Sequence, residues 1–371
     1  MKVPFINPKL RFTDLLRMLR SINSTWLVYG RYTSRFESVL SEYLGGANVV
    51  ATSSCTSALQ LALHLSKVGP GDEVITTPIS WVATSNVIIH SGAKPVFVDI
   101  DPKTGLINED LIEARITPLT KAVLFVDLFG QMPNLTKIRE ICDRHKIFMI
   151  EDAAHALESE RDGNQPGQLS DFAAFSFHSA KNITSGQGGA MTTRTNDDAS
   201  RARILRRDGV INLPDGKRRM VELGFKFDST DFQSALLIGQ LSRIEGKLKK
   251  RKRVHDRYFK EIDSKFAQVI PGENGYKTSN HLTVILVSAE YRDELRKTLL
   301  ERGIQTSVHY EPINLEPYYA KTFGDSIGTF QNAEKFGRAV ISLPTYPSLS
   351  RRKQNYVIKN INQILRKISY K

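Results

Sequence analysis

The chain contains little cysteine and no long apolar segment. Only two of its 371 residues are cysteines, Cys55 and Cys142, too few for a disulfide framework or for a metal or iron–sulfur site built from cysteine alone. No apolar run reaches membrane-spanning length, and the first nine residues lack the apolar core of a signal peptide. These absences favour a cytoplasmic protein with no membrane insertion.

Acidic residues are the minority among the charged residues, which gives a net charge of +13. A basic surface attracts anionic partners, and nucleic acid is one candidate. The densest basic run, residues 247–253, is followed by Val254 and Tyr258 at helical spacing, so we interpret it as the solvated face of a long helix. Because no helix-turn-helix, zinc-finger or RNA-binding motif is present, we expect no nucleic acid partner. A phosphorylated small molecule fits the charge equally well.

Residues 45–195 alternate short β-rich runs with amphipathic helices. This pattern predicts an α/β fold with a mostly parallel sheet covered by helices on both faces, in which ligands bind beyond the carboxyl ends of the strands. Strands are expected at residues 49–52, 73–76, 95–98, 122–126, 148–150, 173–176 and 190–193, and helices at 56–66, 80–90 and 134–145. One long helical stretch is expected from 231 to about 264. We predict a large domain of residues 1–250 and a smaller α+β domain of residues 251–371.

Lys181 and Asp152 are the strongest candidates for catalytic residues. Lys181 follows an apolar strand and precedes a glycine-rich turn, and Asp152 stands at the end of another apolar strand. A pyridoxal phosphate enzyme needs a lysine to form the imine and an aspartate to keep the ring nitrogen protonated. For either residue alone, a surface lysine or a helix-capping aspartate is the better interpretation. Together they favour the cofactor site.

Four further features fit such a site, each with a structural alternative. The hydroxyl-rich segment 52–59 runs from a strand into a helix, where free N–H groups suit a phosphate, although a Ser/Thr helix cap gives the same pattern. Trp81 suits stacking on a flat cofactor or burial against a helix. His155 suits a contact with the cofactor's phenolic oxygen or a structural role. Ser176 suits a phosphate contact or a backbone hydrogen bond.

These motifs resemble those of the DegT/DnrJ/StrS family of pyridoxal phosphate-dependent sugar aminotransferases over nearly the whole chain. Residues 53–59 resemble the family's "SSGTAAL", residues 151–156 its "EDAAHA", and residues 175–189 its "FSFHxxKNITTGEGG". Residues 223–231 are similar to "LGYNYRMTD", and residues 309–310 and 342–347 to the C-terminal signatures. The resemblance implies a fold-type I transferase with a seven-stranded sheet.

The resemblance also implies roles for individual residues. Lys181 is the Schiff-base lysine and Asp152 the partner of the pyridinium nitrogen, and His309 and Tyr310 bind substrate. The remaining cofactor contacts are Thr56, Ser57, Trp81, His155, Ser176 and Lys226. The family forms homodimers with shared active sites, and here the chain departs from the pattern: Lys226 replaces the usual Asn, and Asp228 stands where Arg or Asn is usual. Which of the two reaches the partner's phosphate site stays open.

The reaction implied is transfer of an amino group from an amino acid, glutamate by family analogy, to a nucleotide-linked keto-deoxysugar. Surface polysaccharide or deoxyaminosugar biosynthesis is the implied context. Two alternatives use the same scaffold, a sugar dehydratase and a non-catalytic regulator that retains the cofactor. A dehydratase is expected to carry histidine in place of Lys181 or a cysteine-bound cluster, and a regulator an additional module. The sequence shows none of these features.

Overall fold

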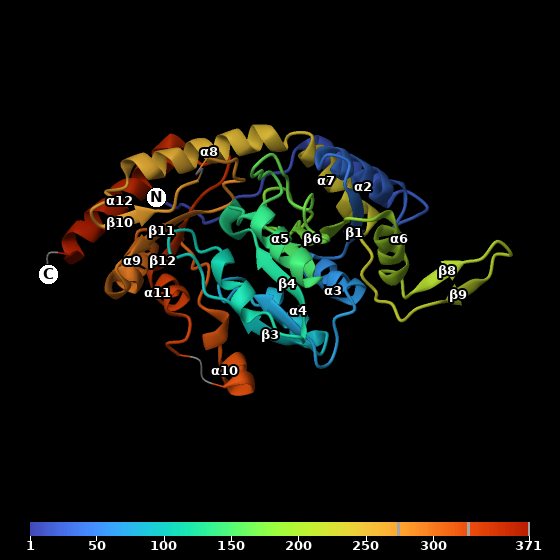
Figure 1. The fold of residues 1–371 in the computed structure, drawn as a ribbon. Coiled ribbons are helices and arrows are strands. Elements are labelled where there is room, and N and C mark those ends of the chain that lie inside the picture. The colour runs from blue at the N-terminus through green and yellow to red at the C-terminus, as the bar shows by residue number, and fades with distance from the viewer. Residues whose placement is uncertain (273–274, 325–326, 370–371) are drawn as a thin grey trace.

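A seven-stranded sheet forms the centre of the computed structural model, which describes residues 1–272, 275–324 and 327–369 (Figure 1). The strand order is β1-β7-β6-β5-β4-β2-β3. Neighbouring strands from β3 to β6 are parallel, and β7 is antiparallel to both β1 and β6. The bounds are β1 Asn48–Thr52, β2 Glu73–Thr76, β3 Lys94–Phe97, β4 Thr120–Val126, β5 Phe148–Asp152, β6 Phe172–Ser176 and β7 Gly189–Thr193. The predicted mostly parallel sheet of seven strands is confirmed.

Helices cover both faces of this sheet because successive strand residues point to opposite faces. Leu124 and Ile150 pack with α3 (Cys55–Leu65) and α4 (Ala83–His90), and α6 (Asn196–Leu205) lies in the same layer. Val123 and Met149 pack on the other face with α5 (Leu135–His145). The helix α2 (Arg31–Tyr43) and the helix α7 (Asp231–Leu241) extend that second layer.

We predicted one long helix from residue 231 to about 264, and this prediction is wrong because the structure has two helices there. The first, α7, ends at Leu241, and α8 covers Ile244–Glu261. Arg243 lies between them with φ −118° and ψ 9°, outside helical geometry, and ion-pairs at 2.6 Å with the buried Asp14 of α1 (Phe12–Ile22). The break therefore places α7 on the large sheet and lets α8 continue towards the C-terminal part of the chain.

A second core belongs to the C-terminal part. An antiparallel sheet of β10 (Ala267–Val269), β11 (Thr283–Val287) and β12 (Val340–Leu343) packs with α8, α9 (Ala289–Glu301) and α12 (Arg351–Ser369). Val3 is buried in this core and bridges to Ile304, so the N-terminal segment joins the C-terminal part. The predicted boundary at residue 250 falls inside α8.

The remaining elements are short helices, turns and one hairpin. They comprise α10 (Pro317–Phe323), α11 (Gln331–Ala339), the hairpin β8 (Val210–Asn212) and β9 (Arg218–Met220), and 3-10 turns at Glu109–Leu111, Glu113–Arg115, Leu128–Gly130 and Ile313–Leu315. Of these, α11 and the turn at Leu128–Gly130 contribute to a further buried cluster. Figure 1 shows the β8–β9 hairpin projecting away from the body of the molecule. Among the residues described, no helix combines the length and apolar character that crossing a bilayer requires.

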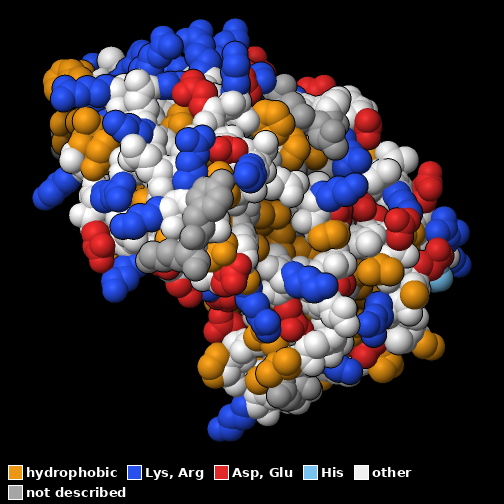
Figure 2. Space-filling model, turned by 90° about the vertical axis from the view of Figure 1, so that its left-hand side faces the viewer, with side chains coloured by type: hydrophobic (Ala, Val, Ile, Leu, Met, Phe, Trp, Pro, Cys, Tyr) orange, Lys and Arg blue, Asp and Glu red, His pale blue; other side chains and the backbone are white. Residues whose placement is uncertain are grey.

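Basic side chains gather along the upper edge of the face in Figure 2, at the height where α8 lies in Figure 1. Lys249, Lys250 and Arg253 of α8 are exposed, as expected for a solvated basic face. Arg251 departs from that expectation because it is buried, and Lys247 is half-buried. The basic run thus has an exposed side, with Lys249, Lys250 and Arg253, and an inward side, with Lys247 and Arg251.

Candidate active site

A cavity of about 510 Å³ opens at the carboxyl ends of the parallel strands. Val126 ends β4, Asp152 ends β5 and Ser176 ends β6, and all three line it. The loops that follow β1 and β2 contribute Ser54 and Trp81 to the same wall. This is the position at which α/β sheets bind ligands. The cavity brings together eight of the predicted site residues: Thr56, Trp81, Asp152, His155, Ser176, Lys181, His309 and Tyr310.

Lys181 reaches the cavity from a loop that folds back on itself after β6. The N–H of Phe177 donates to the carbonyl of Gly188, and the N–H of Ser179 donates to that of Gly186, at 2.9 and 3.0 Å. Gly186 has φ +83°, a conformation that favours glycine, so the glycine-rich turn closes this loop. Burial lowers the pKa of Lys181 to about 8, and the negative charge of Asp152 opposes that shift. At pH 7 about a tenth of the amine is therefore unprotonated, far more than for a lysine with the usual pKa.

Asp152 is buried and held by donors on both oxygens. The Thr84 hydroxyl donates to Oδ2 at 2.8 Å, and the N–H of Ala154 donates to Oδ1 at 3.2 Å. The Cys55 thiol lies 3.7 Å from Oδ1. Burial raises the pKa of Asp152, whereas the Thr84 hydrogen bond favours the charged carboxylate. A fixed carboxylate of this kind suits a protonated pyridine nitrogen.

The N-terminus of α3 has the helix cap that one interpretation of the hydroxyl-rich segment predicts, and its phosphate contact stays a prediction. Ser54 is the N-cap, and its Oγ accepts from the N–H of Ser57 at 3.0 Å. The Ser57 hydroxyl in turn accepts from the N–H of Ser54 at 2.9 Å, so this pair forms a capping box. Ser57 is buried and lies outside the cavity lining, whereas Ser54 and the exposed Thr56 line the cavity. The helix start can hold an anion, with Thr56 and Ser54 nearer to it than Ser57.

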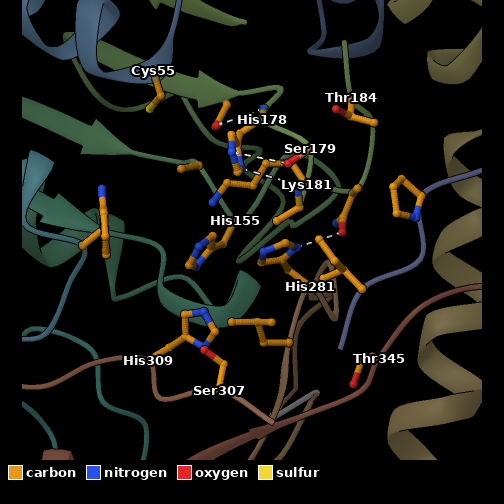
Figure 3. A pocket seen from close by; sticks show the side chains of 18 of the residues that line it. Cys55, His155, His178, Ser179, Lys181, Thr184, His281, Ser307, His309 and Thr345 are labelled. Atoms are coloured by element: carbon orange, nitrogen blue, oxygen red, sulfur yellow. Dashed lines mark hydrogen bonds between the residues drawn. The ribbon is translucent and has the colours of Figure 1, made fainter. Parts of the chain in front are cut away.

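Three histidines face Lys181 from different parts of the chain (Figure 3). Burial lowers the pKa of His155 and His281 well below the usual value and that of His309 to about 4, and the charge of Lys181 adds to each shift. His155 Nδ1 accepts from the N–H of Phe129 at 3.2 Å, which leaves Nε2 as the protonated nitrogen. His155 is therefore a neutral donor suited to a phenolic oxygen.

The aromatic candidates line the same cavity, and only Trp81 among them is exposed. Trp81 is 63% exposed and precedes α4, which begins at Ala83 rather than at the expected residue 80. Its ring lies 6.2 Å from that of Tyr310, centroid to centroid. His309 Nδ1 lies 2.8 Å from the Ser342 hydroxyl. An exposed tryptophan beside a cavity favours stacking on a ligand over burial against a helix.

Lys226 lies apart from the cavity within its own chain. Its side chain is exposed, and Nζ ion-pairs with Asp208 at 3.3 Å and Asp228 at 3.2 Å. Asp228 is buried and points back to Lys226 and to Arg207, so among the two candidates it is Lys226 that extends outward. A cofactor contact from Lys226 would have to be made in a second copy of the chain.

Several cavity residues were not predicted from the sequence. They are Lys247 and Arg251 of α8, His281 before β11, Thr84 of α4, and the N-terminal residues Phe5 and Asn7. Arg251 ion-pairs with the buried Glu158, whose other oxygen accepts from Asn182 Nδ2 at 2.8 Å. His281 Nδ1 lies 3.0 Å from Asn182 Oδ1. A lone histidine or a basic run gives no signal in a single sequence that it faces a cavity.

The site fits pyridoxal phosphate on four independent features. A buried lysine with a lowered pKa and a fixed aspartate share the cavity, and a neutral histidine donor stands beside them. The N-terminus of α3 supplies N–H groups and the Thr56 hydroxyl at one end. Such a combination of cradle, imine-forming amine and ring partner defines the active site of a fold-type I pyridoxal phosphate enzyme.

Comparisons with known proteins agree with this class. The chain belongs to the DegT/DnrJ/EryC1/StrS aminotransferase family, whose model matches residues 9–362. It is 33% identical to the spore coat polysaccharide biosynthesis protein SpsC of Bacillus subtilis, over 98% of this chain and 97% of SpsC. It is also 33% identical to GDP-perosamine synthase of Caulobacter vibrioides, over 96% of this chain and 97% of the synthase.

The fold has a near match among solved structures. Spr1654 of Streptococcus pneumoniae in its apo form superposes with a TM-score of 0.96 at 29% identity, covering 100% of both chains. The PLP form of Spr1654 gives a TM-score of 0.94, covering 99% of this chain and 100% of that one. The fold-type I assignment and the family resemblance are therefore confirmed.

Proposed function

We propose that the protein is a pyridoxal phosphate-dependent aminotransferase that passes an amino group from an amino acid, glutamate in our proposal, to a nucleotide-linked keto-deoxysugar. The observation that carries the proposal is the pairing of Lys181 with Asp152 in one cavity, where their charges interact. The names of SpsC and GDP-perosamine synthase support a nucleotide-sugar acceptor and a place in surface polysaccharide synthesis. The family and the PLP form of Spr1654 support the cofactor.

Different residues of the chain would contact different parts of the cofactor. Asp152 would face its ring nitrogen, Trp81 one face of the ring, and His155 its phenolic oxygen. Thr56, Ser54 and Ser176 would contact the phosphate beside the N-terminus of α3. When bound, the cofactor supplies a ring that accepts electrons from the substrate carbon that loses a proton.

Lys181 supplies the acid–base chemistry. Its pKa of about 8 means that Nζ is neutral often enough near pH 7 to act as a nucleophile or a base, and protonated often enough to act as an acid. Nζ would accept the proton of the donor's α-carbon and later return a proton to the acceptor. Asp152 stays fixed by Thr84 and Ala154 while this occurs, which keeps positive charge at the ring nitrogen favourable.

The proposal includes a cytoplasmic homodimer. Cys55 and Cys142 are both free, which suits a reducing compartment. Exposed apolar side chains of α1 and of the segment after it favour a partner of the same kind, and the projecting hairpin before Lys226 could carry that lysine to a neighbouring copy. His309 and Tyr310, which line the cavity, would contact the substrate.

The test is spectroscopic and chemical. Purified protein with pyridoxal phosphate should show a visible absorption band that glutamate bleaches, and a panel of keto-sugar nucleotides with glutamate should give an aminated product by mass. Lys181→Ala should lose both the band and at least about 1,000-fold of the transfer rate, because it removes both nucleophile and base. Lys277→Ala, at a half-buried lysine outside the cavity lining that pairs with Glu245, is the control.

A colourless wild-type protein would contradict the proposal, as would a Lys181→Ala variant that still transfers the amino group. Two outcomes would identify the alternatives on the same scaffold. Loss of water from the sugar without gain of nitrogen would indicate a dehydratase. A visible band without turnover on any sugar would indicate a non-catalytic regulator.

A further inference from the structure

One wall of the cavity is basic and belongs to α8. Lys247 and Arg251 are four residues apart, so they lie on the same face of this helix, and both line the cavity. Lys249, Lys250 and Arg253 point to solvent from the remaining faces. The inward pair is therefore distinct from the solvated face of the same helix.

Arg251 is buried, and one nitrogen of its guanidinium group lacks a hydrogen-bond acceptor among the described residues. Its Nη2 ion-pairs with Glu158, and its Nε donates to the carbonyl of Ser279 at 3.1 Å. Its Nη1 has no hydrogen-bond partner among the described residues. A buried guanidinium nitrogen without an acceptor costs free energy, and an oxyanion brought by a ligand would supply the acceptor.

Lys247 is the cation of this wall that has no carboxylate partner among the described residues. Its Nζ lies 3.4 Å from Gln240 Oε1 and forms no ion pair within the described ranges. Nearby, Arg243 is paired with Asp14, and Arg251 with Glu158. Burial lowers the pKa of Lys247 to about 8, Arg251 and Arg243 add to the shift, and Asp14 and Glu158 oppose it. Arg17 also lies 3.9 Å from Asp14, so the cations of this cluster outnumber its two carboxylates and leave it with a net positive charge.

This basic wall is connected to the reacting lysine but lies away from the phosphate cradle. Glu158 bonds both Arg251 and Asn182, and Asn182 directly follows Lys181 in the chain. Lys247 contacts Gln240, whose amide hydrogen-bonds the backbone of Thr184, and Figure 3 places Thr184 and Cys55, at the start of α3, on opposite sides of the cavity. An anion held by Lys247 is therefore a part of the substrate rather than the phosphate of the cofactor.

We propose that Lys247 and Arg251 form a subsite for the side-chain carboxylate of a dicarboxylic amino donor. The inference rests on the proposed function and adds to it the residues that select the donor. The excess positive charge of this wall and the guanidinium nitrogen of Arg251 that lacks a partner among the described residues suit a carboxylate. The diphosphate of a nucleotide sugar shares the oxyanion chemistry, and the experiment below separates the two sources.

The test compares charged and neutral donors in the first half of the reaction. Bleaching of the visible band of the holoenzyme is followed with glutamate and with glutamine, whose side chain has the same shape without the charge. Lys247→Met should lower the apparent second-order rate constant for glutamate about 10- to 100-fold, as expected for a lost hydrogen bond between charged groups. The rate constant for glutamine should stay unchanged, and Lys247→Arg should restore much of the glutamate rate. Lys250→Met, on the exposed face of α8, is the control.

A binding measurement gives a readout without turnover. Glutarate, a dicarboxylate that cannot react, should bind the wild-type holoenzyme in calorimetry and bind Lys247→Met about tenfold or more weakly. Its affinity for the wild type should fall as the pH rises past about 8, since Lys247 then loses its proton.

Three outcomes would overturn the donor assignment. The first is an equal loss for glutamate and glutamine, which would indicate a structural role. The second is no loss for either. The third is a loss confined to the second half of the reaction with the nucleotide sugar, which would give the subsite to the diphosphate. A wild-type protein without a visible band would instead contradict the proposed function, and glutarate binding would still test Lys247.

Discussion

Two buried carboxyl groups, Asp127 and Glu151, lie behind Asp152, and we expect them to share one proton because burial raises the pKa of both. Both are fully buried and close enough to interact, and neither oxygen of Asp127, nor Glu151 Oε1, has another hydrogen-bond partner among the described residues. Glu151 Oε2 already accepts from the N–H of Gly167 at 2.8 Å and from the Ser170 hydroxyl at 2.7 Å. Burial raises the pKa of Asp127, and the charge of Glu151 raises it further. The shared proton leaves Asp152 as the carboxylate that faces the cavity.

This proton makes stability depend on pH, with a sign that follows from linkage. The folded protein holds a proton that the unfolded chain releases above the ordinary Asp pKa of about 4. The free energy of unfolding should therefore fall as the pH rises from about 4 towards the raised pKa, by up to about 1.4 kcal/mol per pH unit. Asp127→Asn should remove this slope, as measured by urea unfolding between pH 5 and pH 8.

Asp293→Asn, on the surface, serves as the control and should keep the wild-type slope. An identical slope in wild type and Asp127→Asn would show that the pair carries no shared proton. Activity is a separate readout, because the amide keeps the shape of the pair and Asp152 is untouched.

Single residues differed in how well the sequence predicted them. Lys181 follows an apolar strand and Asp152 ends one, and this local pattern was sufficient to predict that the two share a cavity, whereas their catalytic roles stay a prediction. Ser57 was predicted as a phosphate contact, but its hydroxyl is used by the capping box. His281 and Lys247 were not predicted, because their positions in the cavity depend on how the C-terminal part folds against the sheet.

At the scale of elements, the approach of β7 to the start of α3 depends on Gly189. Gly189 pairs with Thr52 and Ser176, the last residues of the two strands beside it. A Cβ at this position would lie 2.2 Å from the carbonyl carbon of Ser54. Gly189→Ala should therefore push the N-terminus of α3 outward, destabilise the protein by about 1–3 kcal/mol and weaken binding of pyridoxal phosphate.

Thermal unfolding and titration of the apoprotein with pyridoxal phosphate measure the two effects. Gly246→Ala on α8 is the same substitution in open space, where nothing lies within 4 Å of the added carbon. It should leave cofactor binding alone and stabilise the protein by up to about 1 kcal/mol through helix propensity. Equal behaviour of the two variants would show that the contact with Ser54 has no part in the site.

The elements themselves were predicted to within a few residues, because alternating apolar runs and helical spacing are local signals. Two features were not local. The break between α7 and α8 places Arg243 against Asp14, more than two hundred positions away in the sequence. The antiparallel direction of β7 follows from pairing with both β1 and β6, which the pattern of one strand does not show.

At the scale of the whole molecule, α1 is unusual because it buries polar side chains and exposes apolar ones. Its polar Asp14 and Ser21 are buried, whereas Phe12 and Leu19 are 72% and 51% exposed. Leu15 and Ile22 extend this exposed stripe, and Trp26, 70% exposed, follows the helix. An apolar stripe of this kind on a stable surface helix indicates a protein partner, and a second copy of the chain is the partner that we propose.

The double variant Phe12→Glu, Leu19→Glu should therefore be monomeric, because it places charge in the centre of the apolar stripe. Light scattering should give twice the chain mass of 41.8 kDa for the wild type and a single chain mass for the variant. Leu300→Glu, on a leucine of α9 that is 62% exposed outside the stripe, should leave the dimer intact. A monomeric wild type, or a double variant that remains dimeric, would contradict this interface.

Shared active sites predict that two inactive chains can complement each other. A mixed dimer of Lys181→Ala and Lys226→Ala chains contains one cavity with both lysines, Lys181 from one chain and Lys226 from the other. If Lys226 completes the partner's cofactor site, Lys226→Ala alone should bind pyridoxal phosphate more weakly, since it removes a cation from the phosphate site. Mixing after partial denaturation should then restore one strong cofactor site in each mixed dimer, and transfer activity with it. If Lys226 only pairs with Asp208 and Asp228 on its own surface, Lys226→Ala should bind cofactor normally and mixing should add nothing.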